Sequence, residues 1–119
     1  MYDNIGFYLT PSGHSPFEKY LGKLAQKHKD DDVAEILNYI KMLSKFGFAI
    51  NDNFKPEAIK HLQDGVYELR PTSSRIFFFC YVNGMFIILH GWEKKQNKTD
   101  PKEIKKAILE KNNFLKEQK

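Results

Sequence analysis

The dipeptide Asn83-Gly84 constrains the fold of this 119-residue chain more than any other feature of its sequence. It joins two runs rich in aromatic and β-branched residues, 75–82 and 85–92. Asn-Gly suits a two-residue hairpin turn, in which both central residues need positive φ. A shorter run of the same kind, 66–70, comes just before them. We therefore predict three consecutive strands between Gly65 and Lys95 as the centre of the fold.

Two helix-start signals flank these strands. Ser15-Pro16-Phe17-Glu18 and Asp100-Pro101-Lys102-Glu103 each place a capping residue before a proline, with glutamate at the capping-box position. Apolar residues then recur at three- to four-residue spacing, which predicts helices to about His28 and about Phe114. The polar residues 116–119 are expected to form a tail.

Further elements are predicted before and between these. Apolar residues within 33–43 recur at helical spacing, so a second helix should follow the Asp30-Asp31-Asp32 triplet and end at Phe46-Gly47. An N-terminal strand is predicted within 2–10 and a short helical turn within 57–62. The whole chain then reads as one α+β domain, in which an N-terminal helical hairpin covers one face of a small antiparallel sheet and a C-terminal helix follows.

The Asp30-Asp31-Asp32 triplet has a second interpretation, as a metal site. Successive helical residues point in different directions around the axis, and no loop of alternating oxygen ligands follows. Capping of the second helix is therefore favoured, and no metal site is predicted.

Composition narrows the class of protein. A hydrophobic fraction of 41% and an aromatic fraction of 14% are those of a folded domain and exclude a disordered chain. The single cysteine, Cys80, excludes a disulfide framework, and its apolar surroundings favour a small buried side chain over a nucleophile. The longest apolar run, 85–89, is too short to cross a bilayer, and no signal peptide is recognisable. We expect a cytoplasmic protein.

Positive charge is concentrated towards the C-terminus. Residues 1–93 hold 10 Lys/Arg and 11 Asp/Glu, whereas 94–119 hold nine lysines and four acidic residues. The chain has two arginines, Arg70 and Arg75, and both lie in the predicted strands. Arginine offers a planar, bidentate donor that suits phosphate better than lysine does. This charge pattern favours an anionic partner, nucleic acid before membrane.

Several polar residues are predicted to gather at one end of the sheet. Strand alternation places Glu68 on the same face as Arg70, and Arg75 on the same face as Phe77. With Lys94-Lys95 nearby, they would form a basic concavity that could bind RNA phosphates and stabilise charge at a scissile phosphate. Alternatively, Glu68 and Arg70 could form only an ion pair, and the two lysines a solvated turn.

His90 is a further candidate for moving protons at this end of the sheet. Alternation predicts that it shares a face with Phe86, Ile88 and Trp92. A histidine on an apolar strand is more often a hydrogen-bonded core residue than a catalyst, so both interpretations stay open.

Several motifs, taken jointly, resemble the phage-derived HigB-like branch of the RelE/ParE toxin superfamily over nearly the whole chain. They are Tyr8 with Ser12-Gly13-His14-Ser15-Pro16, Leu62-Gln63-Asp64-Gly65-Val66-Tyr67-Glu68-Leu69-Arg70, Arg75-Ile76-Phe77-Phe78-Phe79, and Leu89-His90-Gly91-Trp92-Glu93-Lys94-Lys95 followed by Lys98-Thr99-Asp100-Pro101. The resemblance implies a RelE-like fold. It also implies a toxin of a type II toxin–antitoxin pair that cleaves mRNA in the ribosomal decoding site, without metal or cofactor. The implied partners are the ribosome with its mRNA and a HigA-like helix-turn-helix antitoxin; a heterotetramer with an antitoxin dimer is one such arrangement.

The resemblance also implies roles for individual residues. The RNA 2′-hydroxyl attacks the adjacent phosphate, which Arg75 clamps, while Lys95 neutralises the developing charge or protonates the leaving 5′-oxygen. Arg70 matches a basic position of the family and is expected to make a phosphate or structural contact. Lys94, beside Lys95, and Lys98 are expected to bind RNA phosphates.

Two departures from RelE bear on this assignment. Glu68 stands where RelE has a lysine that helps as a base, so either Glu68 or His90 must take the proton. The terminal helix also lacks the tyrosine that RelE carries there.

Two alternative functions stay open. One is a ParE-like poison of DNA gyrase, which shares the fold without being an enzyme, and the other is an inactive phage-derived interaction or regulatory module. The basic stretch and His90 favour the ribonuclease.

Overall fold

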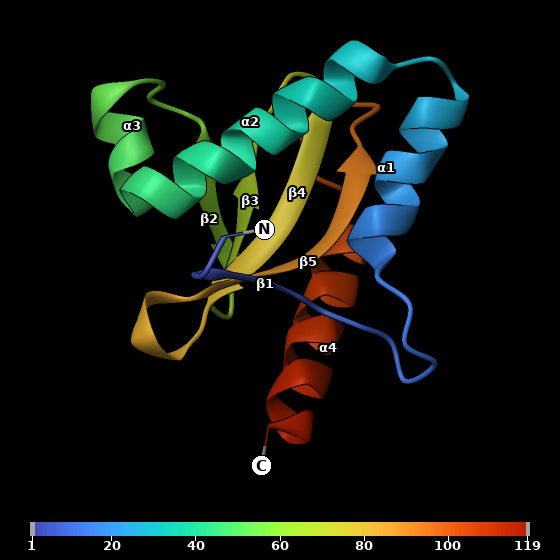
Figure 1. Ribbon diagram of the computed structural model, residues 1–119, viewed down its shortest axis with the longest axis vertical. Helices are drawn as coiled ribbons and strands as arrows, with labels where there is room; N and C mark the ends of the chain where they lie inside the picture. Colours follow the sequence, from blue (N-terminus) through green and yellow to red (C-terminus); the bar gives the residue numbers. More distant parts are fainter. Residues whose placement is uncertain (1, 119) are drawn as a thin grey trace.

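A five-stranded sheet forms the middle of the molecule. The computed structural model describes residues 2–118, and the strands run in the order β1-β5-β4-β3-β2, with β4 at the centre (Figure 1). The strands are β1 Ile5–Phe7, β2 Ile59–Gln63, β3 Val66–Leu69, β4 Ser74–Cys80 and β5 Phe86–Glu93. The predicted α+β class is confirmed, and the arrangement is consistent with a RelE-like fold.

The prediction of an antiparallel sheet holds for four of the five strands. β2, β3, β4 and β5 pair antiparallel with their neighbours, but β1 pairs parallel with β5. The N-terminal strand reaches the sheet edge beside β5, which is distant from it in sequence, and strand pattern alone carries no information on that direction.

The prediction of a helical turn within 57–62 is wrong. Ile59–Gln63 form strand β2, which pairs with β3 across the turn Asp64-Gly65. Both turn residues have positive φ, 52° and 79°. Asp-Gly is a strong hairpin signal in the same way as Asn-Gly, so the sequence did contain the information for this hairpin.

The turn Asn83-Gly84 has the backbone that was predicted. Asn83 and Gly84 have φ of 58° and 74°, and the Met85 N–H donates to the Val82 carbonyl at 3.2 Å.

The expectation of a buried Cys80 is wrong, because this residue is exposed at the end of β4. Desolvation of its thiol raises its pKa, which is the direction opposite to activation of a nucleophile.

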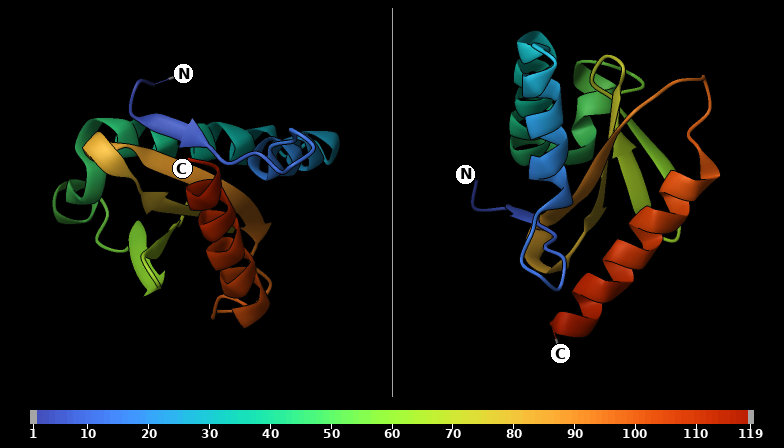
Figure 2. Two further views of the ribbon diagram at one scale, coloured as in Figure 1. Left: turned by 90° about the horizontal axis from the view of Figure 1, so that it is seen from below. Right: turned by 90° about the vertical axis from the view of Figure 1, so that its right-hand side faces the viewer.

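Helices cover both faces of the sheet (Figure 2). α1 (Pro16–Gln26) and α2 (Asp30–Phe46) lie on one face, and α4 (Pro101–Glu117) lies on the other. A 3₁₀ turn and the short helix α3 (Ile50–Asn53) follow α2. No helix of the described residues is long and apolar enough to cross a membrane.

The predicted helix caps are present at three helix ends. The Ser15 hydroxyl accepts from the Glu18 N–H at 3.2 Å, and the Asp100 carboxylate accepts from the Lys102 N–H at 2.9 Å. Gly47 ends α2 with a φ of 57°. The acidic triplet lies in the first turn of α2, so it complements the helix dipole as expected.

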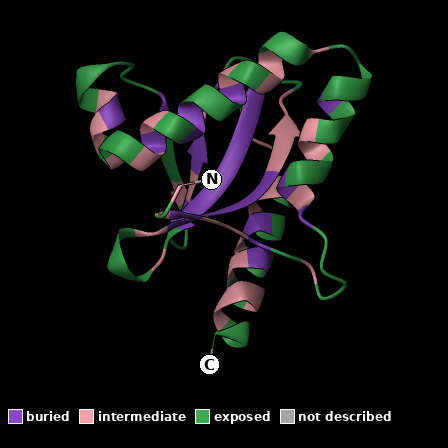
Figure 3. Cartoon of the chain, in the orientation of Figure 1, coloured by how far each residue is buried: buried purple, intermediate pink, exposed green. Residues whose placement is uncertain are grey.

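Each face of the sheet carries its own core, and the central strands are buried on both sides (Figure 3). Ile76 and Phe78 of β4 pack towards α1 and α2, while Phe77 and Phe79 pack towards α4. At about 25 cal/mol per Å² of apolar area removed from water, these clusters are the main source of stability. Phe77 and Phe79 are therefore core residues.

A β-bulge in β5 changes which face its last residues occupy. Ile76 pairs with Gly91 but Phe78 pairs with Ile88, so Leu89 and His90 together lie opposite Phe77. The bulge shifts the alternation by one residue and turns His90 towards α4. The prediction that His90 shares a face with Phe86 and Ile88 is therefore wrong. Trp92, which packs in the α4-side core, shares the face of His90 as predicted.

Candidate functional site

Glu68 organises the end of the sheet where β3 and β4 meet. Its side chain is 1% exposed, and its Oε2 lies 3.6 Å from Nε of Arg70 and 4.0 Å from Nε of Arg75. The Thr99 hydroxyl donates to Oε1 at 2.6 Å. A buried carboxylate is stable only when cations and donors surround it, and here two guanidinium groups and a hydroxyl do so. The ion pair considered for Glu68 and Arg70 is present and extends to Arg75.

Arg75 is held rigidly at this position. Its Nη1 donates to the carbonyl oxygens of Ser74 at 2.8 Å and Thr72 at 3.3 Å. Thr72 itself has a φ of 48°, which folds the β3–β4 connection back so that its carbonyl can reach the guanidinium. Burial, and secondarily the charge of Arg70, lower the pKa of Arg75, while Glu68 opposes that effect. The group stays protonated at neutral pH, so it is a fixed positive charge.

Both arginines open into a pocket at the sheet end. This sheet-end pocket has a volume of about 600 Å³ and is lined by Arg70, Arg75, Lys55 and Thr72 together with Tyr39, Pro56, Glu57 and Ala58. Three of its lining side chains are cations and one, Glu57, is a carboxylate. Such a concave basic pocket can bind a phosphate group and stabilise negative charge that develops on it.

Lys55 lines the pocket although no sequence motif marks it as a site residue. It follows α3, in a segment that reads as a polar connector, and its Nζ lies 5.3 Å from the centroid of the Tyr39 ring. A hydrogen bond with the Tyr39 side chain raises the pKa of Lys55. The Arg70 N–H donates to the Ala58 carbonyl at 2.8 Å, which holds the segment after α3 beside the end of β3.

The loop between β5 and α4, residues 94–100, crosses the same end of the sheet. At its start the Lys94 N–H donates to the Ser73 carbonyl at 2.9 Å, and near its end Thr99 binds Glu68. These two anchors bring the loop and its Lys94, Lys95 and Lys98 to the sheet end, with Lys95 and Lys98 exposed. None of these three lysines lines the sheet-end pocket, so their predicted role beside the arginines stays a prediction.

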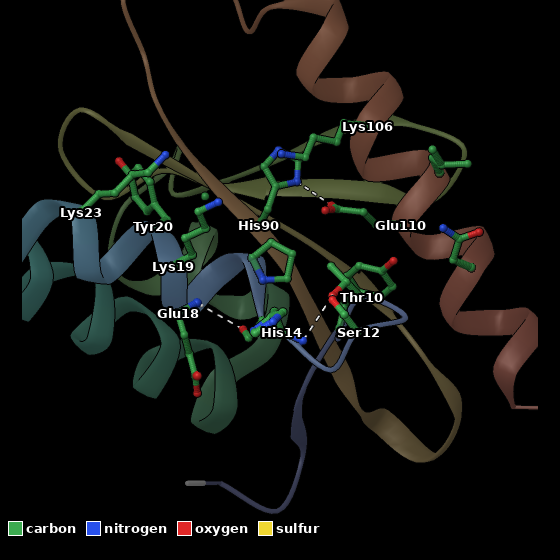
Figure 4. Close-up of a pocket in the computed structure, with 16 residues that line it drawn as sticks. Thr10, Ser12, His14, Glu18, Lys19, Tyr20, Lys23, His90, Lys106 and Glu110 are labelled. Carbon is green, nitrogen blue, oxygen red and sulfur yellow. Dashed lines mark hydrogen bonds and ion pairs between the residues drawn. The ribbon is translucent and has the colours of Figure 1, made fainter.

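His90 lies apart from Glu68, Arg70 and Arg75 in the described chain. Its Nδ1 is 2.6 Å from Oε1 of Glu110 on α4 (Figure 4). Its Nε2 is 3.0 Å from Oε1 of Glu103, also on α4. The ring of Phe77 packs on His90 at 4.7 Å and occupies the strand position between His90 and Glu68. The two candidate bases are thus separated by one strand, and only Glu68 contacts the arginines.

The contacts of His90 fit a structural role that sequence reasoning had kept open. A carboxylate on α4 lies within hydrogen-bond distance of each ring nitrogen. With its side chain 2% exposed, His90 is a buried link that fastens α4 to β5. Glu103 and Glu110 were missed as its partners because their pairing depends on the bulge in β5.

Among residues 2–118, no group of three His, Cys, Asp or Glu side chains is arranged to hold a metal ion. The Asp30-Asp31-Asp32 triplet lies on successive positions of the first turn of α2. Its side chains therefore point in different directions around the helix axis.

Comparison with known proteins places the chain in a family. The profile of the family described as "Phage derived protein Gp49-like (DUF891)" matches residues 19–112. A protein of Aquifex aeolicus (strain VF5), itself described as uncharacterized, is 29% identical over an alignment of 116 residues. The match covers 88% of this chain and 85% of the relative. The matched region runs from α1 into α4 and contains the whole sheet-end pocket. The chain belongs to the phage-derived Gp49-like family.

Proposed function

We propose that this protein is the toxin of a type II toxin–antitoxin pair and acts in the cytoplasm as a ribosome-dependent mRNA endoribonuclease. The observation that carries the proposal is the sheet-end pocket, where Arg70, Arg75 and Lys55 converge beside a loop with three more lysines. The Gp49-like family is associated with RelE/HigB-like toxins, which supports the same activity.

The proposed reaction uses side chains of this protein and the 2′-hydroxyl of ribosome-bound mRNA. The 2′-hydroxyl oxygen attacks the adjacent phosphorus, the bond from phosphorus to the 5′-oxygen breaks, and the products are a cyclic phosphate and a 5′-hydroxyl. Arg75 and Arg70 bind the phosphate oxygens and stabilise their growing charge, with Lys55 as a third cation. Lys95 donates a proton to the leaving oxygen, and Lys94 and Lys98 bind flanking phosphates.

Of the two candidate bases, Glu68 is the one that contacts Arg70 and Arg75. We assign to it the orientation of both guanidinium groups, because its side chain is 1% exposed and its two oxygens face Thr99 and the arginines. The 2′-hydroxyl proton then passes to water. His90, with both ring nitrogens engaged by α4, is assigned to holding that helix.

Primer extension on a translated message tests the function in cells. Expression in a bacterium should arrest growth and produce cuts in phase with codons, and the cuts should disappear when ribosomes are kept off the message. Arg75→Ala and Lys95→Ala should each lower cleavage about 100-fold or more, because each removes a transition-state contact. Growth arrest with intact mRNA and induced DNA damage would instead support a gyrase poison.

A HigA-like helix-turn-helix antitoxin is the partner that we propose. Its co-expression should restore growth, and a complex of the two should copurify. If co-expression of each small helix-turn-helix protein encoded next to the toxin leaves growth arrested, the proposed antitoxin is wrong.

A further inference from the structure

The last part of β5 has an outer edge that no other strand covers. On this side β1 pairs only with residues 86–88, and its last bond runs from the Tyr8 N–H to the Ile88 carbonyl at 2.9 Å. The chain then turns away into a loop closed by the bond from the Thr10 N–H to the His14 carbonyl. Beyond Ile88, β5 is therefore paired on one side alone, with β4.

The ladder with β4 shows which backbone groups point outward. The Lys94 N–H donates to the Ser73 carbonyl, so these two residues form a hydrogen-bonded pair of the antiparallel ladder. Hydrogen-bonded pairs recur at every second residue, so Trp92 and Arg75, which lie opposite each other, form the next one. Gly91 and Glu93 occupy the alternate positions, so their N–H and C=O groups point away from β4. Within residues 2–118 these groups have no hydrogen-bond partner.

A cleft opens directly over this edge. It has a volume of about 990 Å³ and lies between α1, β5, α4 and the segment that links β1 to α1 (Figure 4). The right-hand view of Figure 2 looks onto the edge of β5, with α1 on one side and α4 on the other. His90 and Gly91 are the residues of β5 that line it. We call it the edge cleft.

The walls of the edge cleft carry a positive charge excess. Lys19 and Lys23 of α1 and Lys106 of α4 line it and are exposed. Two carboxylates also line it, but one of them, Glu110, is engaged by His90. Only Glu18 then opposes the three lysines, so an occupant of this cleft is favoured when it is acidic.

We propose that the edge cleft binds an extended acidic segment of a partner protein, which adds to the sheet as a strand beside Gly91–Glu93. An extended peptide that pairs with an open sheet edge gains main-chain hydrogen bonds, and its alternate side chains meet the two walls. The glutamates or aspartates of the segment pair with Lys19, Lys23 and Lys106. The proposal is independent of the proposed RNA chemistry, since the edge cleft and the sheet-end pocket share no lining residue.

The lysines make the edge selective as well as attractive. Charged side chains beside an open edge, lysine above all, discourage pairing with neutral or basic strands. The same lysines attract an acidic strand. The three lysine charges therefore oppose self-association of the protein and also select an acidic partner. Gly91 contributes to the shape, because a side chain at this position would meet the Tyr20 ring that forms part of the wall.

Amide exchange measured by NMR tests strand addition directly. The probe is a blocked hexapeptide of alternating glutamate and valine, titrated to millimolar concentration. In the free protein the amides of Gly91 and Glu93 should exchange quickly, while that of Trp92, bonded to β4, is slow. Saturating peptide should slow Gly91 and Glu93 about tenfold or more and leave Trp92 unchanged.

Matched controls separate strand pairing from attraction between charges. The same peptide with alternate backbone nitrogens methylated keeps its charge but cannot pair, and a lysine–valine peptide has the opposite charge; neither should bind. Lys19→Glu combined with Lys106→Glu should weaken binding about tenfold or more, whereas Lys41→Glu, on an exposed position of α2 outside the cleft, should not.

Three results would overturn the proposal. The first is that amide exchange at Gly91 and Glu93 is unchanged when the peptide is saturating. The second is that the methylated peptide binds as well as the unmethylated one. The third is that a single-stranded RNA ten-mer occupies the cleft and excludes the peptide without protecting these amides. The last result would make the edge cleft a nucleic-acid surface. Loss of RNA cleavage in the sheet-end pocket would alter none of these readouts.

Discussion

Glu68 holds two guanidinium groups that would otherwise repel each other at the end of the sheet. Arg70 and Arg75 both approach the same carboxylate oxygen, and burial, followed by the charge of Arg70, lowers the pKa of Arg75. Removing one partner of a buried ion pair leaves an uncompensated charge, which is costly. The stability of the site should therefore depend on the charge of Glu68 and not only on its shape.

Glu68→Gln should lower the free energy of unfolding by about 3 kcal/mol, since the amide keeps the volume but leaves the arginines without an anion. Urea unfolding followed by circular dichroism measures this. Glu57→Gln, an exposed glutamate at the rim of the same pocket, serves as the control and should change stability little. If both variants unfold at the same urea concentration, Glu68 does not organise the site.

His90 depends in the same way on the helix above it. Glu110→Ala should lower the free energy of unfolding by about 2–3 kcal/mol, because Nδ1 of a buried ring loses its acceptor. Glu117→Ala, in the exposed last turn of α4, is the control. Hydrogen exchange of the α4 amides should become faster in Glu110→Ala, and unchanged exchange would show that His90 does not fasten α4 to the sheet.

At the scale of elements, the two hairpins show what the sequence could and could not predict. Asn83-Gly84 was recognised because strong β-formers flank it on both sides. Asp64-Gly65 carries the same turn signal, but the short run before it follows Pro56 and resembles a helix start. The β5 bulge and the parallel pairing of β1 have no local signal at all, because both arise from packing against distant strands.

The backbone at Gly65 gives a test of the second hairpin. Gly65 has a φ of 79°, and an added Cβ would lie 3.0 Å from Nζ of Lys111, so Gly65→Ala should cost about 1 kcal/mol of stability. Gly22, exposed in the middle of α1 with open space around it, gives the opposite case, and Gly22→Ala should stabilise by about 0.5–1 kcal/mol. Thermal unfolding of both variants measures the contrast. A shift of the same sign in both would contradict this account of the turn.

A salt bridge joins the connection between α1 and α2 to the end of β5. Lys29 donates to Glu93 at 2.5 Å, and that hydrogen bond, with the charges of Lys29, Lys27 and Lys95, lowers the pKa of Glu93. A lowered folded-state pKa means that the pair stabilises the fold above the usual glutamate range and loses this contribution as pH falls through the folded-state value.

Glu93→Gln should therefore reduce stability at pH 7 and make no difference in strong acid. Since Glu93 is partly exposed, the effect at pH 7 should be below about 1 kcal/mol. Urea midpoints of wild type and Glu93→Gln between pH 2 and pH 7 give the comparison. Curves that differ by the same amount at every pH would contradict the assignment.

At the scale of the whole molecule, the sheet-end pocket is assembled from parts that are distant in sequence. β3 supplies Glu68 and Arg70, the start of β4 supplies Arg75, and the segment after α3 supplies Lys55. The sequence predicted that Glu68, Arg70 and Arg75 gather, because alternation and turn position place them on neighbouring strands. It could not predict Lys55 or exclude His90, because one depends on helix packing and the other on a bulge.

The central claim is that this pocket binds and cleaves RNA. The most direct measurement is the cleavage rate of ribosome-bound mRNA in a purified translation system. Arg75→Lys, which keeps the charge but loses the planar fork, should lower the rate about 100-fold, and Lys55→Ala should lower it measurably without affecting folding. Lys41→Ala, an exposed lysine elsewhere on α2, should cleave like the wild type. Wild-type rates in folded Arg75→Lys and Lys55→Ala, or intact mRNA with the unmodified protein, would contradict the account.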